Sequence, residues 1–193
     1  VVDIVVAALL LFLLAPLLGL LALAVRISSP GPILFRQRRI GQHGREIEVL
    51  KFRTLRVNTD ADVTWSVEDD PRQTSVGKWL RRLSLDELPQ FWNVLRGDMS
   101  LVGPRPERPH FVSRFSAQVT HYADRHRLPV GLTGLAQIRG RNALSWSERI
   151  EHDLEYVQTQ SILVDLRVVV ATVAPLLTGH GAEGHPTDDP LAS

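Results

Sequence analysis

The sequence predicts a membrane-associated domain of the α+β class, and three observations lead to this expectation. An uncharged apolar run fills positions 4–25, two β-prone runs flank a glycine-containing turn at positions 41–44, and apolar residues recur at helical spacing in the second half of the chain. A chain of 193 residues is about one domain long and has enough apolar content to build a core. Helices combined with a small β-sheet define the α+β class.

The apolar run extends from Ile4 to Val25 and is bounded by Asp3 and Arg26. Its 22 residues give about 33 Å of helix at ~1.5 Å per residue, enough to cross a bilayer core of ~30 Å. The run is longer than the apolar region of a secretion signal, so we expect it to be retained. Pro16 removes one helical hydrogen bond, so the segment can either cross the bilayer or bend and leave on the side of entry.

Positive charge is concentrated directly after this run. Residues 26–56 hold eight Lys and Arg and two Glu, although the net charge of the whole chain is only +1. By the positive-inside rule this stretch faces the cytoplasm, where it is attracted to anionic lipid headgroups. We expect no nucleic-acid partner, because few aromatic residues are interleaved with the basic residues for base stacking. The absence of cysteine excludes a disulfide framework and a thiolate metal site.

The next elements follow from breakers and short patterns. Ser28 to Pro32 is a cluster of helix breakers that ends the apolar segment. The β-prone runs at 33–35 and 47–52 are expected to pair as a hairpin and form a small sheet. Positions 58–73, rich in Asp and Thr, predict a surface loop, and positions 76–83 predict a short basic helix.

The dipeptide Asp86-Glu87 places two adjacent carboxylates where a helix is expected to begin. Pro89 is tolerated only in the first turn of a helix, so the helix through positions 91–95 should start near Asp86. The helix dipole would keep a carboxylate ionised there and attract phosphate. Two acids beside several cations indicate a metal ion and a phosphorylated substrate. The alternative is a capping box from Ser84 to Glu87, which would only stabilise the helix start.

A second feature suited to phosphate is the segment Pro104-Arg105-Pro106, which follows a turn and a brief strand at 97–103. Flanking prolines fix the backbone and hold one guanidinium in place, which favours bidentate binding of a phosphate group. The alternative is an ordinary loop with a solvated arginine.

The remaining sequence predicts further helices. Positions 107–127 should be helical, and positions 131–141 should form a glycine-punctuated loop with a short strand. Positions 145–158 predict a helix whose apolar stripe packs in the core or on the membrane surface. Positions 162–177 are apolar, but interrupting charges leave them too short to span a bilayer. The tail at 179–193 is expected to be disordered.

A series of motifs covers nearly the whole chain. They are Ser29-Pro30-Gly31-Pro32, Phe35-Arg36-Gln37, Lys51-Phe52-Arg53-Thr54, Asp70-Pro71-Arg72, Leu80-Arg81-Arg82, Ser84 to Gln90, Asn93-Val94-Leu95, Gly97 to Pro106, and Gly131 to Gln137. In content and order they resemble the monotopic phosphoglycosyl transferases, bacterial enzymes that load a sugar phosphate onto a polyprenol phosphate.

The resemblance implies a fold and a location. Residues 1–28 would form a re-entrant membrane helix, and residues 29–178 a monotopic catalytic domain with interfacial amphipathic helices, on the cytoplasmic face of the bacterial inner membrane. It also implies a reaction in which a sugar 1-phosphate passes from a UDP-sugar to a polyprenol phosphate such as undecaprenyl phosphate. This step initiates synthesis of a surface glycan or exopolysaccharide.

The resemblance further assigns the site. Asp86 would be the nucleophile that forms an aspartyl-phosphosugar intermediate, Glu87 its partner in the catalytic dyad, and both would hold Mg²⁺. Basic side chains that would hold phosphate groups lie in the matching motifs: Lys51, Arg53, Arg81 and Arg105. General chemistry agrees, because a carboxylate nucleophile divides phosphoryl transfer into two steps, and Mg²⁺ with fixed cations offsets charge on the oxygens.

One departure from the family pattern concerns topology. The family usually has Ser-Pro in the membrane helix, whereas this chain has Ala15-Pro16, so the bend lacks a hydroxyl that could bond a freed carbonyl. The alternative function is a non-catalytic, membrane-anchored scaffold for a polysaccharide assembly complex. The adjacent acids beside Lys51 and Arg105 argue against it. The sequence leaves open the sugar, the polyprenol length and the oligomeric state, including a homo-oligomer.

Overall fold

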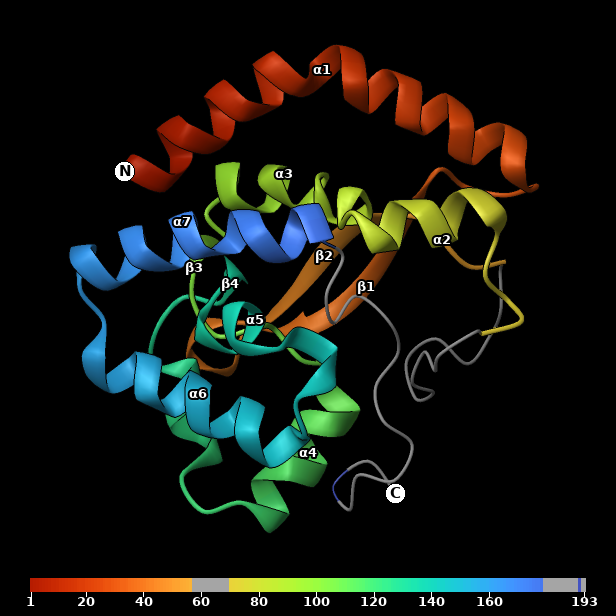
Figure 1. The fold of residues 1–193 in the computed structure, drawn as a ribbon. Helices are drawn as coiled ribbons and strands as arrows, with labels where there is room; N and C mark the ends of the chain where they lie inside the picture. Colours follow the sequence, from red (N-terminus) through yellow and green to blue (C-terminus); the bar gives the residue numbers. More distant parts are fainter. Residues whose placement is uncertain (57–69, 179–190, 192–193) are drawn as a thin grey trace.

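The structure, a computed structural model, describes residues 1–56, 70–178 and 191 (Figure 1). The predicted α+β class is confirmed, because helices in these ranges accompany two separate two-stranded sheets. The predicted tail and most of the predicted loop at 58–73 lie outside the described residues. The elements, in order, are α1 (Val2–Ser28), β1 (Leu34–Ile40), η1 (Gln42–Gly44), β2 (Glu46–Phe52), α2 (Ser75–Arg82), η2 (Leu85–Glu87), α3 (Gln90–Leu95), β3 (Ser100–Val102), α4 (Pro109–Gln118), η3 (Tyr122–His126), β4 (Gly131–Thr133), α5 (Leu135–Arg139), η4 (Arg141–Ala143), α6 (Trp146–Thr159) and α7 (Ile162–Thr178).

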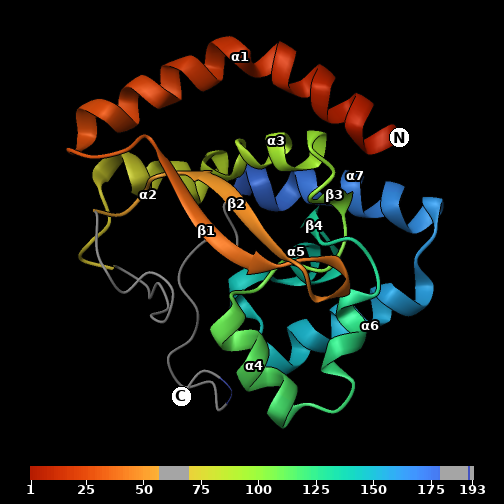
Figure 2. The ribbon, with the colours of Figure 1, turned by 180° about the vertical axis from the view of Figure 1, so that it is seen from behind.

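Helix α1 is an arch whose two ends lie against the rest of the domain while its middle stands away from it (Figures 1 and 2). Pro16 lies inside the helix and cannot donate to the carbonyl one turn earlier, which is the usual cause of such a bend. The helix is long and apolar enough to cross a membrane by length and composition.

Both halves of α1 pack on the same domain. In the N-terminal half, Ala7 is fully buried in a cluster with Val49 and Val94. In the C-terminal half, Leu21 and Val25 pack with residues of β2 and α2. Each end is also bonded to the domain, because Ser100 Oγ donates to Asp3 Oδ2 at 2.5 Å and Arg53 Nη2 donates to the Ser29 carbonyl at 2.7 Å. The arch is therefore part of the folded domain and does not project from it.

Helices α2, α3 and α7 form the next layer below the arch (Figures 1 and 2). The side chains of α1 and α7 that do not pack inward are largely apolar. Large apolar residues of these two helices that remain exposed include Ile4, Val5, Leu9, Phe12, Leu13, Leu20, Leu23, Ile162, Leu163, Leu166, Val169, Val170 and Val173. We call these residues the apolar surface. The tryptophans of α2 and α3, Trp79 and Trp92, are also about half exposed.

The predicted hairpin is confirmed. Strands β1 and β2 pair antiparallel from Leu34 opposite Phe52 to Ile40 opposite Glu46. The chain reverses through η1, where His43 and Gly44 both take positive φ values of 56° and 76°. β1 continues well beyond the apolar run at 33–35 because its later, basic residues still pair with β2 across the hairpin.

The predicted helix at 107–127 is wrong in its length. Helix α4 stops at Gln118, and a separate 3-10 helix, η3, follows the left-handed residue His121 (φ 62°). The break lets η3 fold back against α6, so that Phe115, Tyr122 and Trp146 share one buried cluster. Tertiary packing therefore overrides the helical pattern of the sequence here.

Candidate active site

The two carboxylates lie in the 3-10 turn η2. This differs from the predicted position at the start of an α-helix, because α3 begins only at Gln90, with Pro89 as its N-cap. The capping-box alternative is also wrong, since Ser84 adopts a left-handed conformation (φ 55°) and makes no capping hydrogen bond. The side chain of Glu87 instead reaches partners that are distant in sequence.

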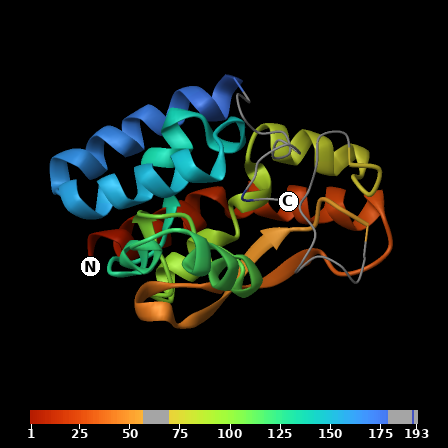
Figure 3. The ribbon, with the colours of Figure 1, turned by 90° about the horizontal axis from the view of Figure 1, so that it is seen from below.

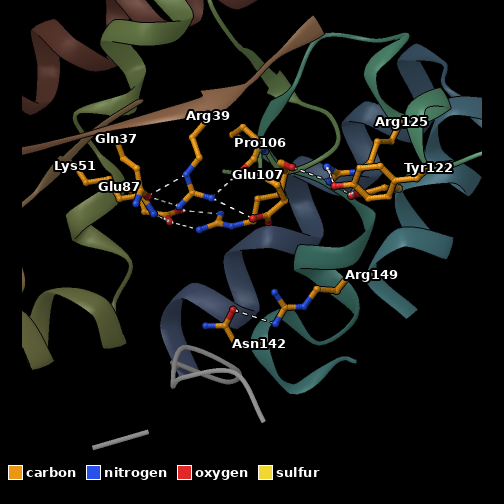
Figure 4. Close-up of polar contacts among 12 residues, drawn as sticks. Gln37, Arg39, Lys51, Glu87, Pro106, Glu107, Tyr122, Arg125, Asn142 and Arg149 are labelled. Atoms are coloured by element: carbon orange, nitrogen blue, oxygen red, sulfur yellow. Dashed lines mark hydrogen bonds and ion pairs between the residues drawn. The ribbon is translucent and has the colours of Figure 1, made fainter. Parts of the chain in front are cut away.

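Glu87 is clamped between two cations. Lys51 Nζ donates to Glu87 Oε1 at 2.6 Å, Arg105 Nη2 donates to the same oxygen at 2.5 Å, and Arg105 Nη1 lies 3.4 Å from Oε2. Figure 4 shows the Lys51 and Glu87 side chains meeting at one end of a row of polar contacts. These hydrogen bonds join three of the six residues that the sequence assigns to the site.

Asp86 is bonded differently. Its side chain is only 7% exposed, yet no hydrogen bond to its carboxylate is present in the described residues. The carboxylate faces the same cavity as Glu87. A carboxylate that no protein group engages is available to contact a ligand in the cavity.

The pKa values of the two acids move in opposite directions. Burial, together with the neighbouring charge of Glu87, raises the pKa of Asp86, although Lys51, Arg81 and Arg105 partly oppose this. Burial would also raise the pKa of Glu87, but Arg105 and Lys51 hold it well below its usual range. Adjacent acids whose pKa values are pushed apart can take different roles, and here the cations favour the ionised form of Glu87 more than that of Asp86.

The cavity has a volume of about 90 Å³ and is lined by residues from both halves of the chain. Its walls come from β2, α2, η2, the segment after β3, η3, α5, η4 and α6. Charged side chains that line it include Lys51, Arg81, Asp86, Glu87, Arg105 and Arg141. In all, six Lys and Arg side chains and four Asp and Glu side chains line it, and a concave site with this surplus of cations suits a negatively charged ligand.

The other two predicted phosphate-binding residues have different positions. Arg81, at the end of α2, lines the cavity, and its charge lowers the pKa of Asp86. Arg53 is not among the lining residues, because its guanidinium turns toward the end of α1 and donates to the carbonyl and hydroxyl of Ser29. The structure therefore places Arg53 at the C-terminal end of α1 and outside the cavity.

Two glycines, Gly103 and Gly131, allow the close backbone packing that positions the segment carrying Arg105. A Cβ atom on Gly103 would lie 2.3 Å from the Pro129 carbonyl oxygen, and one on Gly131 would lie 2.1 Å from the Gly103 nitrogen. Only glycine permits backbones to approach so closely where β3 pairs with β4. The glycine-punctuated loop thus fixes the start of the Pro104-Arg105-Pro106 segment.

Several lining residues could not be predicted from the sequence. Arg141, in a left-handed conformation (φ 55°), reaches across the cavity to donate to Ser84 Oγ. Arg125 and Asp153 form an ion pair at another part of the wall. Arg125 and Asp153 lie inside patterns that read as ordinary amphipathic helix.

The donor groups fit Mg²⁺ only together with a ligand. The described part of the chain has no cluster of three or more His, Cys, Asp or Glu side chains that could hold a metal ion. Mg²⁺ commonly takes one or two carboxylates and completes its shell with water and substrate phosphates. Asp86 and Glu87 can supply the carboxylates, and a diphosphate in the cavity could supply the rest.

These features define a class of site: an enclosed carboxylate, a second carboxylate held by cations, and a basic cavity in a domain that also exposes an apolar surface. Comparison with known proteins agrees with that class. Residues 1–179 match the family model described as bacterial sugar transferase. The chain therefore belongs to the bacterial sugar transferase family.

Named relatives point in the same direction. The chain is 48% identical over 188 residues to a UDP-glucose:undecaprenyl-phosphate glucose-1-phosphate transferase of Caulobacter vibrioides, covering 94% of this chain and 70% of the relative. It is 40% identical over 184 residues to a UDP-N-acetylgalactosamine-undecaprenyl-phosphate N-acetylgalactosaminephosphotransferase of Aeromonas hydrophila, covering 93% of this chain but only 44% of the relative. It is also 38% identical over 196 residues to the exopolysaccharide production protein ExoY of Rhizobium meliloti, covering 93% and 85% of the two chains.

Proposed function

We propose that this chain transfers a sugar 1-phosphate from a UDP-sugar to a polyprenol phosphate through a covalent intermediate on Asp86, and so initiates synthesis of a bacterial surface glycan. The observation that carries the proposal is the unequal bonding of the dyad. Glu87 is paired with Lys51 and Arg105, whereas the buried carboxylate of Asp86 faces the cavity without a hydrogen bond in the described residues. The names of the relatives support the same donor and acceptor classes.

The first step is attack on the donor. An Asp86 carboxylate oxygen forms a bond to the sugar-bearing phosphorus of the UDP-sugar, and the bond from that phosphorus to the bridging oxygen breaks. The electron pair leaves with the bridging oxygen, so the leaving group is UMP. The sugar phosphate remains on Asp86 as an acyl phosphate.

The second step is attack by the acceptor. A phosphate oxygen of the polyprenol phosphate bonds to the same phosphorus, and the bond to Asp86 breaks, which regenerates the free carboxylate. The product is a polyprenyl diphosphate sugar. In both steps the phosphoryl group carries negative charge that the protein must offset.

Cations from this chain can supply that offset. Lys51 and Arg105 stand on Glu87, next to the reacting carboxylate, and Arg81 lines the same cavity. Arg105 presents a planar fork that can bond a phosphate with one edge while the other stays on Glu87. Mg²⁺, when bound by Asp86, Glu87 and the diphosphate, would neutralise charge on the oxygens of the transferred group.

The acceptor requires access from a membrane. We propose that α1 is a re-entrant helix whose arch enters one leaflet, with the apolar surface of α1 and α7 against lipid and the basic stretch on the cytoplasmic face. Support comes from the bonds that hold both ends of α1 to the domain, at Asp3 and at Ser29. A helix that crossed the bilayer would carry Asp3 about 35 Å from its other end, on the far side from Ser100.

A donor panel tests the proposal. Purified protein in detergent or nanodiscs is incubated with undecaprenyl phosphate, Mg²⁺ and radiolabelled UDP-glucose, UDP-galactose, UDP-N-acetylglucosamine or UDP-N-acetylgalactosamine. We expect label from at least one donor to move into the organic phase and UMP to be released in equal amount. Release of UDP in place of UMP, or no transfer from any donor, would contradict the proposed reaction.

A further inference from the structure

The segment Pro104-Arg105-Pro106 is held by its carbonyl groups. Two of its three residues are prolines, which have no backbone N–H to donate, so the backbone can be fixed mainly through its oxygens. The Gly131 N–H donates to the Pro104 carbonyl at 2.9 Å, Arg125 Nη2 donates to the Arg105 carbonyl at 2.7 Å, and Arg39 Nη1 donates to the Pro106 carbonyl at 3.0 Å. Three consecutive carbonyls are thus anchored by β4, η3 and β1.

Both arginines that hold this segment are themselves held by a buried carboxylate. Arg39 Nη1 lies 3.2 Å from Glu107 Oε2. Arg125 donates from Nε to Asp153 Oδ2 at 3.1 Å, from Nη2 to the same oxygen, and from Nη1 to the Tyr122 hydroxyl at 3.1 Å. Figure 4 shows the Arg39–Glu107 pair and the Arg125–Tyr122 pair on either side of this segment.

The Arg125–Asp153 pair is the more enclosed of the two. Arg125 is 2% exposed and Asp153 is 3% exposed. Such a pair is weak support for stability, because the cost of removing both charges from water offsets much of their attraction, and an apolar pair of similar volume often stabilises as well. What an apolar pair could not do is direct a hydrogen bond at the Arg105 carbonyl.

That carbonyl belongs to the same residue whose side chain bonds Glu87 of the dyad. The residue before a proline is confined to extended conformations, so Arg105 keeps little freedom besides rotation of its peptide plane and its side chain. Arg125 fixes the peptide plane, and the side chain of the same residue bonds Glu87 at 2.5 Å. A shift of the peptide plane would therefore move the guanidinium relative to both carboxylates.

We propose that Arg125, oriented by Asp153 and Tyr122, is a positioning residue that holds Arg105 in its productive place on Glu87 during sugar phosphate transfer. Arg39, paired with Glu107, holds the neighbouring Pro106 carbonyl and is a second, weaker support for the same segment. The inference rests on the proposed function. It assigns to η3 and α6 a part in the reaction although neither contributes a reacting group.

The test compares two Arg→Lys substitutions. Arg125→Lys keeps a positive charge beside Asp153 but loses the fork that bridges Asp153 and the Arg105 carbonyl. Arg139→Lys is the matched control, because Arg139 pairs with Glu155, also on α6, and does not line the cavity. We expect Arg125→Lys to lower the single-turnover rate of UMP release by on the order of 10- to 100-fold, and Arg139→Lys to leave it within about twofold.

Two further measurements separate positioning from loss of fold. The charge of Arg105 lowers the pKa of both Asp86 and Glu87. A displaced Arg105 should therefore move the acid limb of the rate profile to higher pH in Arg125→Lys and not in the control. In a double-mutant cycle, Arg125→Lys should have less than about a threefold effect in an Arg105→Ala background, because the group that it positions is already gone.

Additive effects in the cycle, or an unshifted acid limb, would overturn the proposal while the wild-type protein still releases UMP. If wild type releases no UMP, the proposed function itself fails, so the two failures are distinguishable. Tyr122→Phe serves where Arg125→Lys does not fold, since it removes one hydrogen bond to Arg125 and keeps the ring. It should lower the rate by roughly three- to tenfold with the same pH shift, and an unchanged rate would count against the proposal.

Discussion

The cavity and the apolar surface lie in one domain but present opposite kinds of side chain, charged in the cavity and hydrocarbon on the apolar surface. Charged side chains line the cavity, and one of them, Glu87, forms ion pairs with Lys51 and Arg105. The apolar surface exposes large hydrocarbon side chains of α1 and α7 to the surroundings. Seen from below, α7 (blue) lies along one side of the molecule and α1 (red) crosses behind the other elements, with β1 and β2 (orange) on the side opposite α7 (Figure 3).

The difference matches the two substrates of the proposed reaction. A UDP-sugar is water-soluble and polyanionic, so it needs a basic cavity, whereas a polyprenol phosphate presents its charge at the surface of a bilayer. If this division is right, changes in the cavity should impair both half-reactions, and changes in α1 should impair mainly the acceptor step. The predictions below test that division, from the largest expected effect to the smallest.

The largest effect is expected for Asp86→Asn. The amide keeps the size of the side chain but is not a nucleophilic anion, so UMP release and lipid transfer should both fall by at least about 10⁴-fold. The variant should still sediment with membranes, because α1 is unchanged. Both rates are measured with radiolabelled donor. Activity above a trace would show that Asp86 is not the nucleophile.

Glu87→Gln should have the second-largest effect. The amide cannot balance the charges of Lys51 and Arg105, so turnover should fall by about 10²-fold. The charge of Glu87 raises the pKa of Asp86, so its removal should lower that pKa. Because Asp86 must be ionised to react, the acid limb of UMP release should move to lower pH. A shift to higher pH would contradict the proposed division of roles within the dyad.

Pro16→Leu tests the other region. Restoring the helical hydrogen bond should straighten α1, so that the dyad no longer sits at the depth of the lipid headgroups. Transfer to undecaprenyl phosphate should fall on the order of tenfold, while UMP release without acceptor stays within about twofold. Equal losses in both steps would show that the arch supports the cavity and not acceptor access.

Thiol labelling checks the topology behind this prediction. The chain contains no cysteine, so single cysteines at Val1 and Ser28 can be labelled without background. A re-entrant α1 leaves both positions on the cytoplasmic side, where both should resist an impermeant reagent in intact cells. Labelling at position 1 alone would show a spanning helix.

Ala15→Ser, which restores a hydroxyl near the bend, should favour the re-entrant form by about 1 kcal/mol.

Lys51→Met should give the smallest but most diagnostic change. The charge of Lys51 lowers the pKa of Asp86 and of Glu87, so its loss should raise both. The acid limb of UMP release should then move to higher pH, opposite to the shift in Glu87→Gln. Lys78→Met, on α2 and outside the cavity lining, is the control and should leave the profile unchanged. Shifts in the same direction for Lys51→Met and Glu87→Gln would contradict the electrostatic account.

Local sequence predicts the parts of the fold whose determinants are local. The hairpin at Ile40 to Glu46 follows from its turn residues, and the short basic pattern at 76–83 predicts α2, for which the structure adds Thr74 as the N-cap. The helix start near Asp86 was wrong because Ser84 is left-handed, and Glu87 is drawn to Lys51 and Arg105. These contacts join positions more than ten residues apart, which propensity and capping patterns do not record.

The site shows the same limit. Lys51, Arg81 and Arg105, which lie in recognisable motifs, line the cavity together with the dyad, while their role in binding phosphate stays a prediction. Arg53 lies two residues after Lys51 in the same motif, so an extended strand would put both side chains on one face. Strand β2 ends at Phe52, however, and Arg53 donates to Ser29 at the end of α1. Asp153 was missed because a carboxylate on an amphipathic helix has the same pattern whether it is solvated or, as here, buried against an arginine of η3.

The central claim is that Asp86 carries the sugar phosphate between donor and acceptor. The most direct test mixes the wild-type protein with Mg²⁺ and a UDP-sugar labelled in the sugar-bearing phosphate, without polyprenol phosphate. The account predicts a burst of UMP comparable in amount to the protein, and label bound covalently to the peptide that contains Asp86 when the quenched protein is digested and analysed by mass spectrometry. No UMP and no bound label until acceptor is added would contradict it, since that result requires direct transfer in a ternary complex.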